Sequence, residues 1–237
     1  MHKKLIALFL CMVFILGITV GTVGAAAANE EIVAILNRVV KIKLNGSDYI
    51  PLDEDGTQMY PITYKGRTYL PARSIAKVLS IAVNYDPINQ IIHLGERGLV
   101  PLEGEAYVNN HTSQLSTDTT LLQVNKQQYK WGIIYTGTAG YYEYSGFIYP
   151  KGNYQKFGGV ACMEDLDGST EEVIIKIREN DFEGKVLKEI VVKKGESIPF
   201  EIDIPGVNTL YIQNLVTDRV PKNTNPDIMM ISEPYFK

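Results

Sequence analysis

The sequence predicts an α+β N-terminal domain followed by an all-β C-terminal sandwich, both behind an export segment. Three observations predict this organisation. Residues 1–28 are mostly apolar, residues 39–95 combine short strand patterns with one helical stripe, and the chain from about residue 111 onward is almost entirely strand-like. With 237 residues, 45% of them hydrophobic, the chain can bury a core in one large domain or two small ones.

Residues 1–28 have the three parts of a secretory signal peptide. Lys3 and Lys4 supply the positive start, residues 5–23 the apolar middle and residues 24–28 the small residues that a signal peptidase requires. We therefore expect cleavage and a secreted or cell-wall-associated protein. The alternative is an uncleaved membrane anchor, because about 19 apolar residues could just span a bilayer.

The charge and the cysteines limit the function classes. The formal net charge is −4, and removal of residues 1–28 takes away two lysines and no acidic residue. A strongly basic nucleic-acid-binding surface is therefore not expected. Cys162 is then the only cysteine, so no intramolecular disulfide can form, and its apolar surroundings favour a buried small side chain over a nucleophile.

Residues 29–97 are predicted to form the α+β domain. Two hairpins are expected over residues 39–52 and 60–70, with turns at Asn-Gly and Lys-Gly dipeptides. Apolar residues at helical spacing predict a short helix over residues 72–80. A further hairpin over residues 81–94 completes this unit.

Residues 64–94 carry a motif. Its matching positions are Gly66, Arg67, Tyr69, Pro71, Arg73, Ile75, Ala76, Leu79, Val83 and Asp86. With Ser80 where glycine is usual and Tyr85 where tryptophan is frequent, this motif resembles the stalk domain named after the N-terminal domain of copper amine oxidases. The resemblance implies an extracytoplasmic accessory module, common in exported proteins of Gram-positive bacteria, without copper or oxidase chemistry.

The remaining chain is expected to contain a linker with a first sandwich strand, residues 98–124, and the sandwich itself, residues 125–237. The clearest alternating patterns span residues 146–149, 172–178, 186–192, 198–204 and 209–216. Short strands at roughly ten-residue spacing, with no helical run between them, predict a β-sandwich.

This second half also resembles a known family. The similarity is carried by residues 149–165, 173–178, 199–203 and 207–212. They are similar to NPCBM-like modules, which are jelly rolls of the galactose-binding type regarded as carbohydrate-binding modules. The resemblance implies a jelly-roll sandwich with a sugar ligand.

Ten aromatic residues gather between positions 129 and 157. Sugars stack their C–H faces on exposed rings and need polar partners for their hydroxyl groups. The candidate ligand-binding residues are Trp131, Tyr141, Tyr142 and Tyr144 for stacking, with Glu143 and Asn153 for hydroxyl groups. The alternative is core packing, because aromatic residues favour strands and half of an alternating set faces the core.

The acidic cluster Glu164, Asp165 and Asp167 could ligate calcium, since calcium prefers several carboxylate oxygens. The order of residues does not fit an EF-hand loop, and a turn between strands explains the cluster better. Calcium binding by these three residues stays an open alternative, and the sequence predicts neither a metal nor a cofactor.

Catalysis is not expected. His93 and His111 are scattered, so with one cysteine they form neither a zinc set nor a triad, and no serine-hydrolase, phosphate-loop or zinc-protease motif is present. The sequence predicts a non-catalytic extracytoplasmic protein whose β-sandwich binds a cell-wall or surface polysaccharide. A structural spacer or envelope protein-interaction module without a sugar ligand is the alternative, and a membrane is a partner only if the signal segment stays uncleaved.

Overall fold

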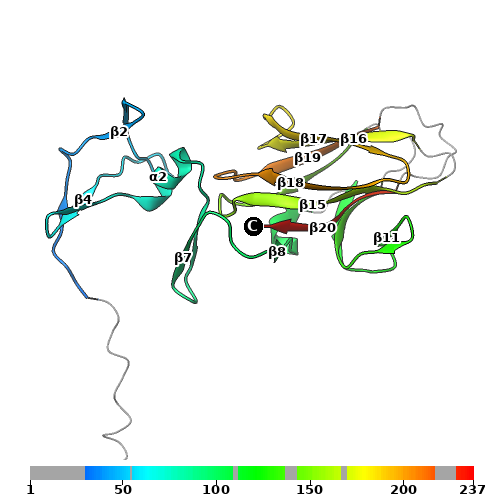
Figure 1. Ribbon diagram of the computed structural model, residues 1–237, viewed down its shortest axis with the longest axis horizontal. Helices are drawn as coiled ribbons and strands as arrows, with labels where there is room; N and C mark the ends of the chain where they lie inside the picture. Colours follow the sequence, from blue (N-terminus) through cyan, green and yellow to red (C-terminus); the bar gives the residue numbers. More distant parts are fainter. Residues whose placement is uncertain (1–29, 54, 109–111, 137–142, 167–169, 217–227) are drawn as a thin grey trace, which may run out of the picture. The chain divides into compact units, whose positions relative to one another are not determined.

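A computed structural model shows two compact units (Figure 1). The described residues are 30–53, 55–108, 112–136, 143–166, 170–216 and 228–237. The first unit contains the chain up to Ile50 together with Tyr60–Leu70, and the second contains Pro51–Met59 and Pro71–Lys237. The predicted signal peptide lies outside the described residues. No helix in the described ranges has the length and apolar character needed to span a bilayer.

The first unit consists of short antiparallel strands. A three-stranded sheet has the order β1 (Ile35–Leu36), β4 (Ile62–Tyr64) and β5 (Arg67–Tyr69), and a separate hairpin pairs β2 (Ile42–Leu44) with β3 (Ser47–Tyr49). None of the large apolar side chains described in this unit is buried, so the core of the protein lies in the second unit.

Both hairpin turns of the first unit form where the sequence predicts them. Asn45 and Gly46 have φ values of 48° and 87°, and Lys65 and Gly66 have values of 46° and 73°. A two-residue turn with positive φ at both positions matches the right-handed twist of the flanking strands.

After Pro51–Met59, the second unit continues with the single α-helix of the described chain. The helix α2 (Ala72–Val78) follows Pro71, and the hairpin of β6 (Val83–Asp86) and β7 (Ile91–Leu94) comes next. Ser80 follows the C-cap residue Leu79 and has a φ of 55°, in the left-handed region where a glycine would be less strained. The expected elements of residues 71–94 are therefore present, although the helix is shorter than predicted.

The structure does not support a separate α+β domain over residues 29–97. The helix α2 and the β6–β7 hairpin group with the sandwich, whereas β1 to β5 form the other unit. The side chain of Gln155 explains part of this grouping, because it accepts a hydrogen bond from Ala82 N at 2.9 Å and donates one to Ser80 O at 3.2 Å. The boundaries expected at residues 97 and 124 stay predictions.

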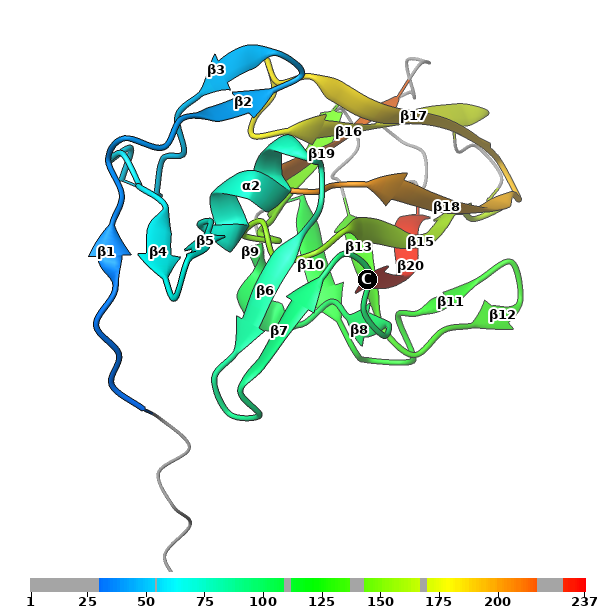
Figure 2. The ribbon, with the colours of Figure 1, turned by 60° about the vertical axis from the view of Figure 1, so that its left-hand side comes forward.

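The rest of the second unit is a β-sandwich of two antiparallel sheets, as the alternating pattern predicts (Figures 1 and 2). The sheet that we call the β15 sheet has the order β10-β13-β20-β15-β18, and β8 also pairs with β20. Its strands are β8 (Val100–Pro101), β10 (Ser113–Ser116), β13 (Gly132–Thr136), β15 (Lys156–Met163), β18 (Ser197–Asp203) and β20 (Ile228–Phe236).

The other sheet, called the β16 sheet, has the order β17-β16-β19-β14-β9. Its strands are β9 (Tyr107–Val108), preceded by the short helix η1 (Gly104–Ala106), β14 (Glu143–Ile148), β16 (Glu172–Glu179), β17 (Val186–Lys193) and β19 (Leu210–Val216). Strand β16 shows how the core forms, because Val173, Ile175 and Ile177 alternate inward and are completely or almost completely buried. Apolar residues of both sheets meet there, as in other two-layer sandwiches.

A second, smaller core covers part of the outer face of the β15 sheet. The hairpin of β11 (Gln123–Val124) and β12 (Gln127–Gln128) packs on this face through Val124 and the preceding Leu122. Its cluster of buried residues contains Leu122, Val124, Tyr129, Ile134, Cys162 and Met230. Cys162 is buried, so the prediction of a packed rather than a reactive thiol is consistent with the structure.

Candidate functional site

The outer face of the β15 sheet carries an open hollow next to the part covered by the β11–β12 hairpin. Its volume is about 430 Å³, which lies within the range of pockets that hold small ligands. The lining residues are Leu99, Trp131, Gly159, Val160, Pro199, Phe200, Glu201, Glu233 and Tyr235. They come from β15, β18 and β20 and from the segments just before β8 and β13.

A β-bulge in β20 shapes this hollow. Gly158 pairs with Tyr235 and Val160 pairs with Ser232, so the register shifts between these pairs and Glu233 lies in the irregular stretch. Glu233 adopts a φ of 46°, which costs a non-glycine residue on the order of 1 kcal/mol. Bulges redirect side chains and are frequent next to functional sites. The strain at Glu233 therefore marks this stretch as a candidate site.

The bulge also fixes the position of Trp131. The indole Nε1 of Trp131 donates a hydrogen bond to Pro234 O at 2.9 Å. The backbone N of Glu233 donates in turn to Trp131 O at 2.9 Å. Trp131 is only partly buried, so an oriented ring is presented at the hollow.

Tyr235 supplies a second aromatic ring, and Gly158 makes room for it. A Cβ atom at Gly158 would lie 2.6 Å from Cζ and from the hydroxyl oxygen of Tyr235, and 2.8 Å from Phe200 O. Only glycine therefore lets the ring of Tyr235 lie against β15. The hydroxyl group of Tyr235 donates a hydrogen bond to Oε2 of Glu201 at 3.0 Å, which orients the ring further.

Glu201 is the centre of a charged network beside the rings. Lys237 Nζ lies 2.6 Å from Oε2 of Glu201, and Lys156 Nζ lies 2.9 Å from Oε1. Hydrogen bonds from Lys237 and Lys156 lower the pKa of Glu201 to about 2. Lys156 also pairs with Glu96 at 2.9 Å, and the hydrogen bonds to Glu96 and Glu201 raise its pKa. Glu201 is therefore a firmly ionised acceptor of hydrogen bonds at neutral pH.

Glu233 is the other carboxylate of the hollow, and its surroundings differ. Among the described residues its Oε1 accepts one hydrogen bond, a long one of 3.4 Å from the backbone N of Lys130. Within the described ranges no lysine, arginine or histidine forms an ion pair with Glu233. In the described chain the hollow therefore contains one carboxylate paired with cations, Glu201, and one that no described cation pairs with, Glu233.

The structure brings one of the six sequence-predicted residues to this site, and that residue is Trp131. The expectation of an exposed ring is wrong for Tyr144, which is 4% exposed and packs in the core. Tyr144 shares its side of β14 with the fully buried Ile148, and this side faces inward.

Of the other four predicted residues, only Asn153 has a described side chain, and it is not among the lining residues. Tyr141 and Tyr142 lie outside the described residues. Glu143 begins β14 and pairs with Leu215, and its side chain lies outside the described part. Asn153 lies between β14 and β15, where its backbone N donates to Pro150 O at 3.0 Å. These four assignments stay predictions.

Sequence reasoning missed Tyr235, Glu201, Glu233 and the two lysines. They lie on β15, β18 and β20 or, for Lys237, directly after β20, and they approach Trp131 only through the pairing of these strands with one another and with β13. One signal was available. Gly158 and Gly159 interrupt a strand pattern, and glycine within a strand often marks a bulge or a close approach.

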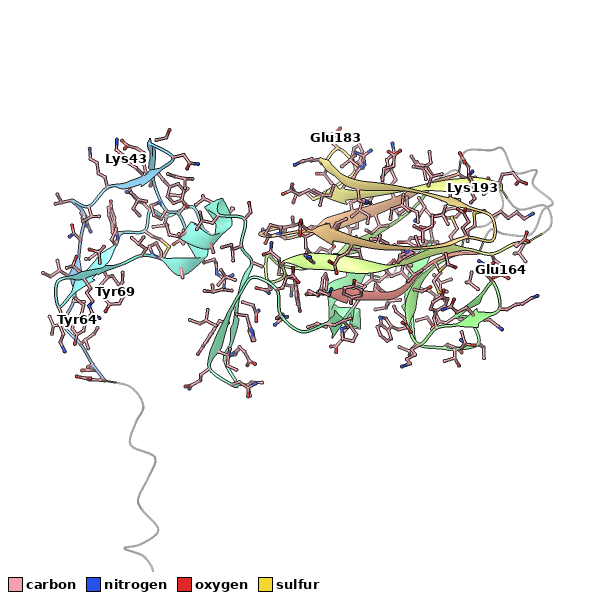
Figure 3. All side chains as sticks on the ribbon, in the orientation of Figure 1. Lys43, Tyr64, Tyr69, Glu164, Glu183 and Lys193 are labelled. Carbon is pink, nitrogen blue, oxygen red and sulfur yellow. The ribbon has the colours of Figure 1, made fainter. Side chains whose placement is uncertain are left out.

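The acidic cluster has a structural role on the same sheet. Glu164 Oε2 accepts a hydrogen bond from the backbone N of Asn125 at 2.6 Å, and Figure 3 shows Glu164 near the β11–β12 hairpin. Asp165 pairs with Lys194 at 3.6 Å. Asp167 lies outside the described residues, so calcium binding by all three is not tested. Elsewhere in the described chain no group of three potential ligands could hold a metal ion.

No protein-family model matches the sequence, and a search of curated proteins finds no match either. Solved structures with a similar arrangement do exist. Among them is a structure of the CBM51-2 and INT domains of Clostridium perfringens ZmpB in complex with GlcNAc, with 11% identity and a TM-score of 0.44. The match covers 66% of this chain and 36% of that chain, so the chain spans about a third of that structure's length.

Two other similar structures are smaller. A CBM51 module of Clostridium perfringens GH95 in complex with methyl-galactose has 12% identity and a TM-score of 0.42, and the match covers 59% of this chain and 99% of that chain. The CBM22-1 xylan-binding domain of Paenibacillus barcinonensis Xyn10C has 10% identity and a TM-score of 0.35, with 58% and 92% covered. At these identities and TM-scores the likeness is one of sandwich arrangement alone.

Proposed function

We propose that the hollow on the β15 sheet binds a carbohydrate and that the protein does so without catalysing a reaction. The observation that carries this proposal is the position of Trp131, whose partly exposed ring donates a hydrogen bond to Pro234 O while its backbone O accepts one from Glu233 N. Tyr235 and the carboxylates of Glu201 and Glu233 line the same hollow. Rings for stacking beside fixed acceptors for hydroxyl groups are what a saccharide requires.

The charged network supports binding rather than hydrolysis. A glycosidase needs two carboxyl groups across the scissile bond, one of which must keep its proton near neutral pH. The pKa of Glu201 is lowered to about 2 by its hydrogen bonds to Lys237 and Lys156, so this group is unsuited to act as the acid. Its fixed, ionised oxygens are suited to accept hydrogen bonds from sugar hydroxyl groups.

The proposal also includes the location of the protein. The signal-peptide pattern of residues 1–28 and the resemblance of residues 64–94 to stalk domains support export and a role at the cell surface. A cell-wall or surface polysaccharide is then the ligand class within reach. The stalk and NPCBM-like assignments belong to this proposal.

A structural spacer or protein-interaction module is the second candidate. The observation that favours it is the exposure of apolar residues in the first unit, where Val33 is 96% and Val39 is 87% exposed. Apolar side chains exposed together are typical of protein contact surfaces. This candidate predicts that the protein binds no saccharide and that substitutions in the hollow change no interaction.

The proposal is tested by retention of the purified exported chain on insoluble polysaccharides, including cell walls, chitin and xylan, followed by a glycan array that contains GlcNAc and methyl-galactose. We expect retention on at least one of these materials, and a loss of retention for Trp131→Ala and for Tyr235→Ala. Phe182→Ala is the matched control, because Phe182 is 63% exposed and lies outside the hollow. Equal retention of all three variants, with their circular dichroism unchanged, would show that the hollow is not the binding site.

A further inference from the structure

We infer that the hollow prefers saccharides that carry a free amino group, such as the glucosamine units of a deacetylated polysaccharide. This inference rests on the proposed function and adds the ligand class. It starts from an imbalance of charge. The carboxylates of Glu201 and Glu233 line the hollow, while no lysine or arginine is among its lining residues.

The lysines near the hollow are already engaged. Lys237 and Lys156 both lie within 3 Å of Glu201, and Lys156 lies equally close to Glu96. Binding an anionic sugar would require these cations to leave their carboxylates. The hollow is therefore poorly suited to uronic acids, sulfated sugars or phosphate-containing polymers, because like charges placed together destabilise a complex.

The unmatched charge at the site is that of Glu233. In the described part of the chain no ion pair involves this residue, and its only described hydrogen bond through the carboxylate is the long one from Lys130 N. The bulge holds Glu233 in the left-handed region directly between the partners of Gly158 and Val160. A carboxylate that no cation of the described chain neutralises is an acceptor for an ammonium group.

The two rings strengthen the same preference. Aromatic faces attract cations, and tryptophan does so best. The backbone hydrogen bond between Glu233 N and Trp131 O holds the two residues side by side, and both line the hollow. A saccharide that stacks on Trp131 would therefore place its amino group in the hollow that Glu233 also lines. A sugar with a neutral N-acetyl group could stack on the ring but could not form an ion pair with Glu233.

The experiment compares glucosamine oligomers with N-acetylglucosamine oligomers of the same length by calorimetry, in a slightly acidic buffer in which the amine is protonated. We expect the amine-bearing oligomer to bind about three- to five-fold more tightly, as one exposed ion pair allows. Glu233→Gln should abolish this difference, because the amine-bearing oligomer should lose more affinity than the N-acetylated oligomer, which has no charge to pair with Glu233. Rising salt should reduce the preference in the same way.

Glu183→Gln is the control, because Glu183 is an exposed carboxylate in the turn between β16 and β17, away from the hollow (Figure 3). Equal affinity for both oligomers, or a preference that Glu233→Gln leaves intact, would overturn the amine assignment and leave carbohydrate binding standing. Binding of neither oligomer nor any other glycan would overturn the proposed function itself. Tighter binding of an anionic oligomer would contradict the inference directly.

Discussion

The outer face of the β15 sheet has two halves that the same strands build in opposite ways. In the covered half, Cys162 and Met230 are buried beneath the β11–β12 hairpin by Leu122 and Val124. In the open half, the lining residues include Gly159, Tyr235, Glu201 and Glu233. No hairpin packs over these residues in the described chain. One half is thus made for stability, while the other carries backbone strain and exposed rings. The comparison teaches that the hollow is a feature of the sheet and not a packing defect.

The largest expected effect is a loss of stability in the covered half. Leu122 is fully buried, so Leu122→Ala should lower the free energy of unfolding by roughly 2–4 kcal/mol through lost burial and a new cavity. Urea unfolding measures this loss. Leu121→Ala is the matched control, since Leu121 is 49% exposed. Glycan retention by the folded Leu122→Ala protein should persist, and its disappearance would show that the two halves are not independent.

The next largest effect is expected in the open half, where Gly158→Ala should lower both stability and glycan affinity. Gly158→Ala places a Cβ atom against the ring of Tyr235 and against Phe200 O, and such overpacking costs roughly 1–3 kcal/mol. Displacement of the ring should also weaken glycan binding. Gly104→Ala is the control, because nothing lies within 4 Å of a Cβ at that position. Equal stability and affinity for both variants would mean that Gly158 does not position Tyr235.

Trp131→Ala should change affinity more than stability. Loss of the stacking ring is expected to weaken glycan binding about ten-fold, which corresponds to about 1.4 kcal/mol. The effect on unfolding should be smaller than that of Leu122→Ala, because Trp131 is only partly buried. Calorimetry and urea unfolding of the same samples separate the two quantities. A variant that loses stability but keeps its affinity would place Trp131 among the structural residues.

The smallest expected effect concerns acid stability. The pKa of Glu201 is lowered from 4.5 to about 2 in the folded protein. A lowered pKa stabilises the fold above the unfolded-state value, and this contribution is lost as pH falls from about 4.5 toward 2. Because the network is partly exposed, its loss should cost about 1 kcal/mol or less. Glu201→Gln should flatten this acid limb in thermal unfolding, and an unchanged limb would contradict the assignment.

Most of the sandwich could be predicted from the sequence because alternation is a local property. The residues that alternate in β16, such as Val173 and Ile175, are buried as expected. In a strand whose two faces both carry apolar or aromatic side chains, alternation does not show which face points to the core. In β14, Tyr144 and Ile148 face inward while Phe147 stacks with Tyr149 on the other side. The wrong expectation for Tyr144 follows from this ambiguity.

The binding hollow could be predicted only in part. Trp131 is visible in the sequence as the single tryptophan, but its partners depend on strand register and on the bulge at Glu233. Neither the register nor a positive φ at a glutamate follows from local propensity. The paired glycines of β15 were the one local sign, and their meaning depends on the ring of Tyr235 that packs above Gly158.

The most direct test of carbohydrate binding at the hollow uses the single tryptophan of the chain. In a ¹⁵N-correlated NMR titration with the retained oligosaccharide, the indole N–H signal of Trp131 and the amide signals of Gly158 and Gly159 should shift together, with one dissociation constant. Amide signals of β16 and β17 should stay in place. Saturable shifts confined to the β16 sheet, with the indole signal unmoved, would contradict the account.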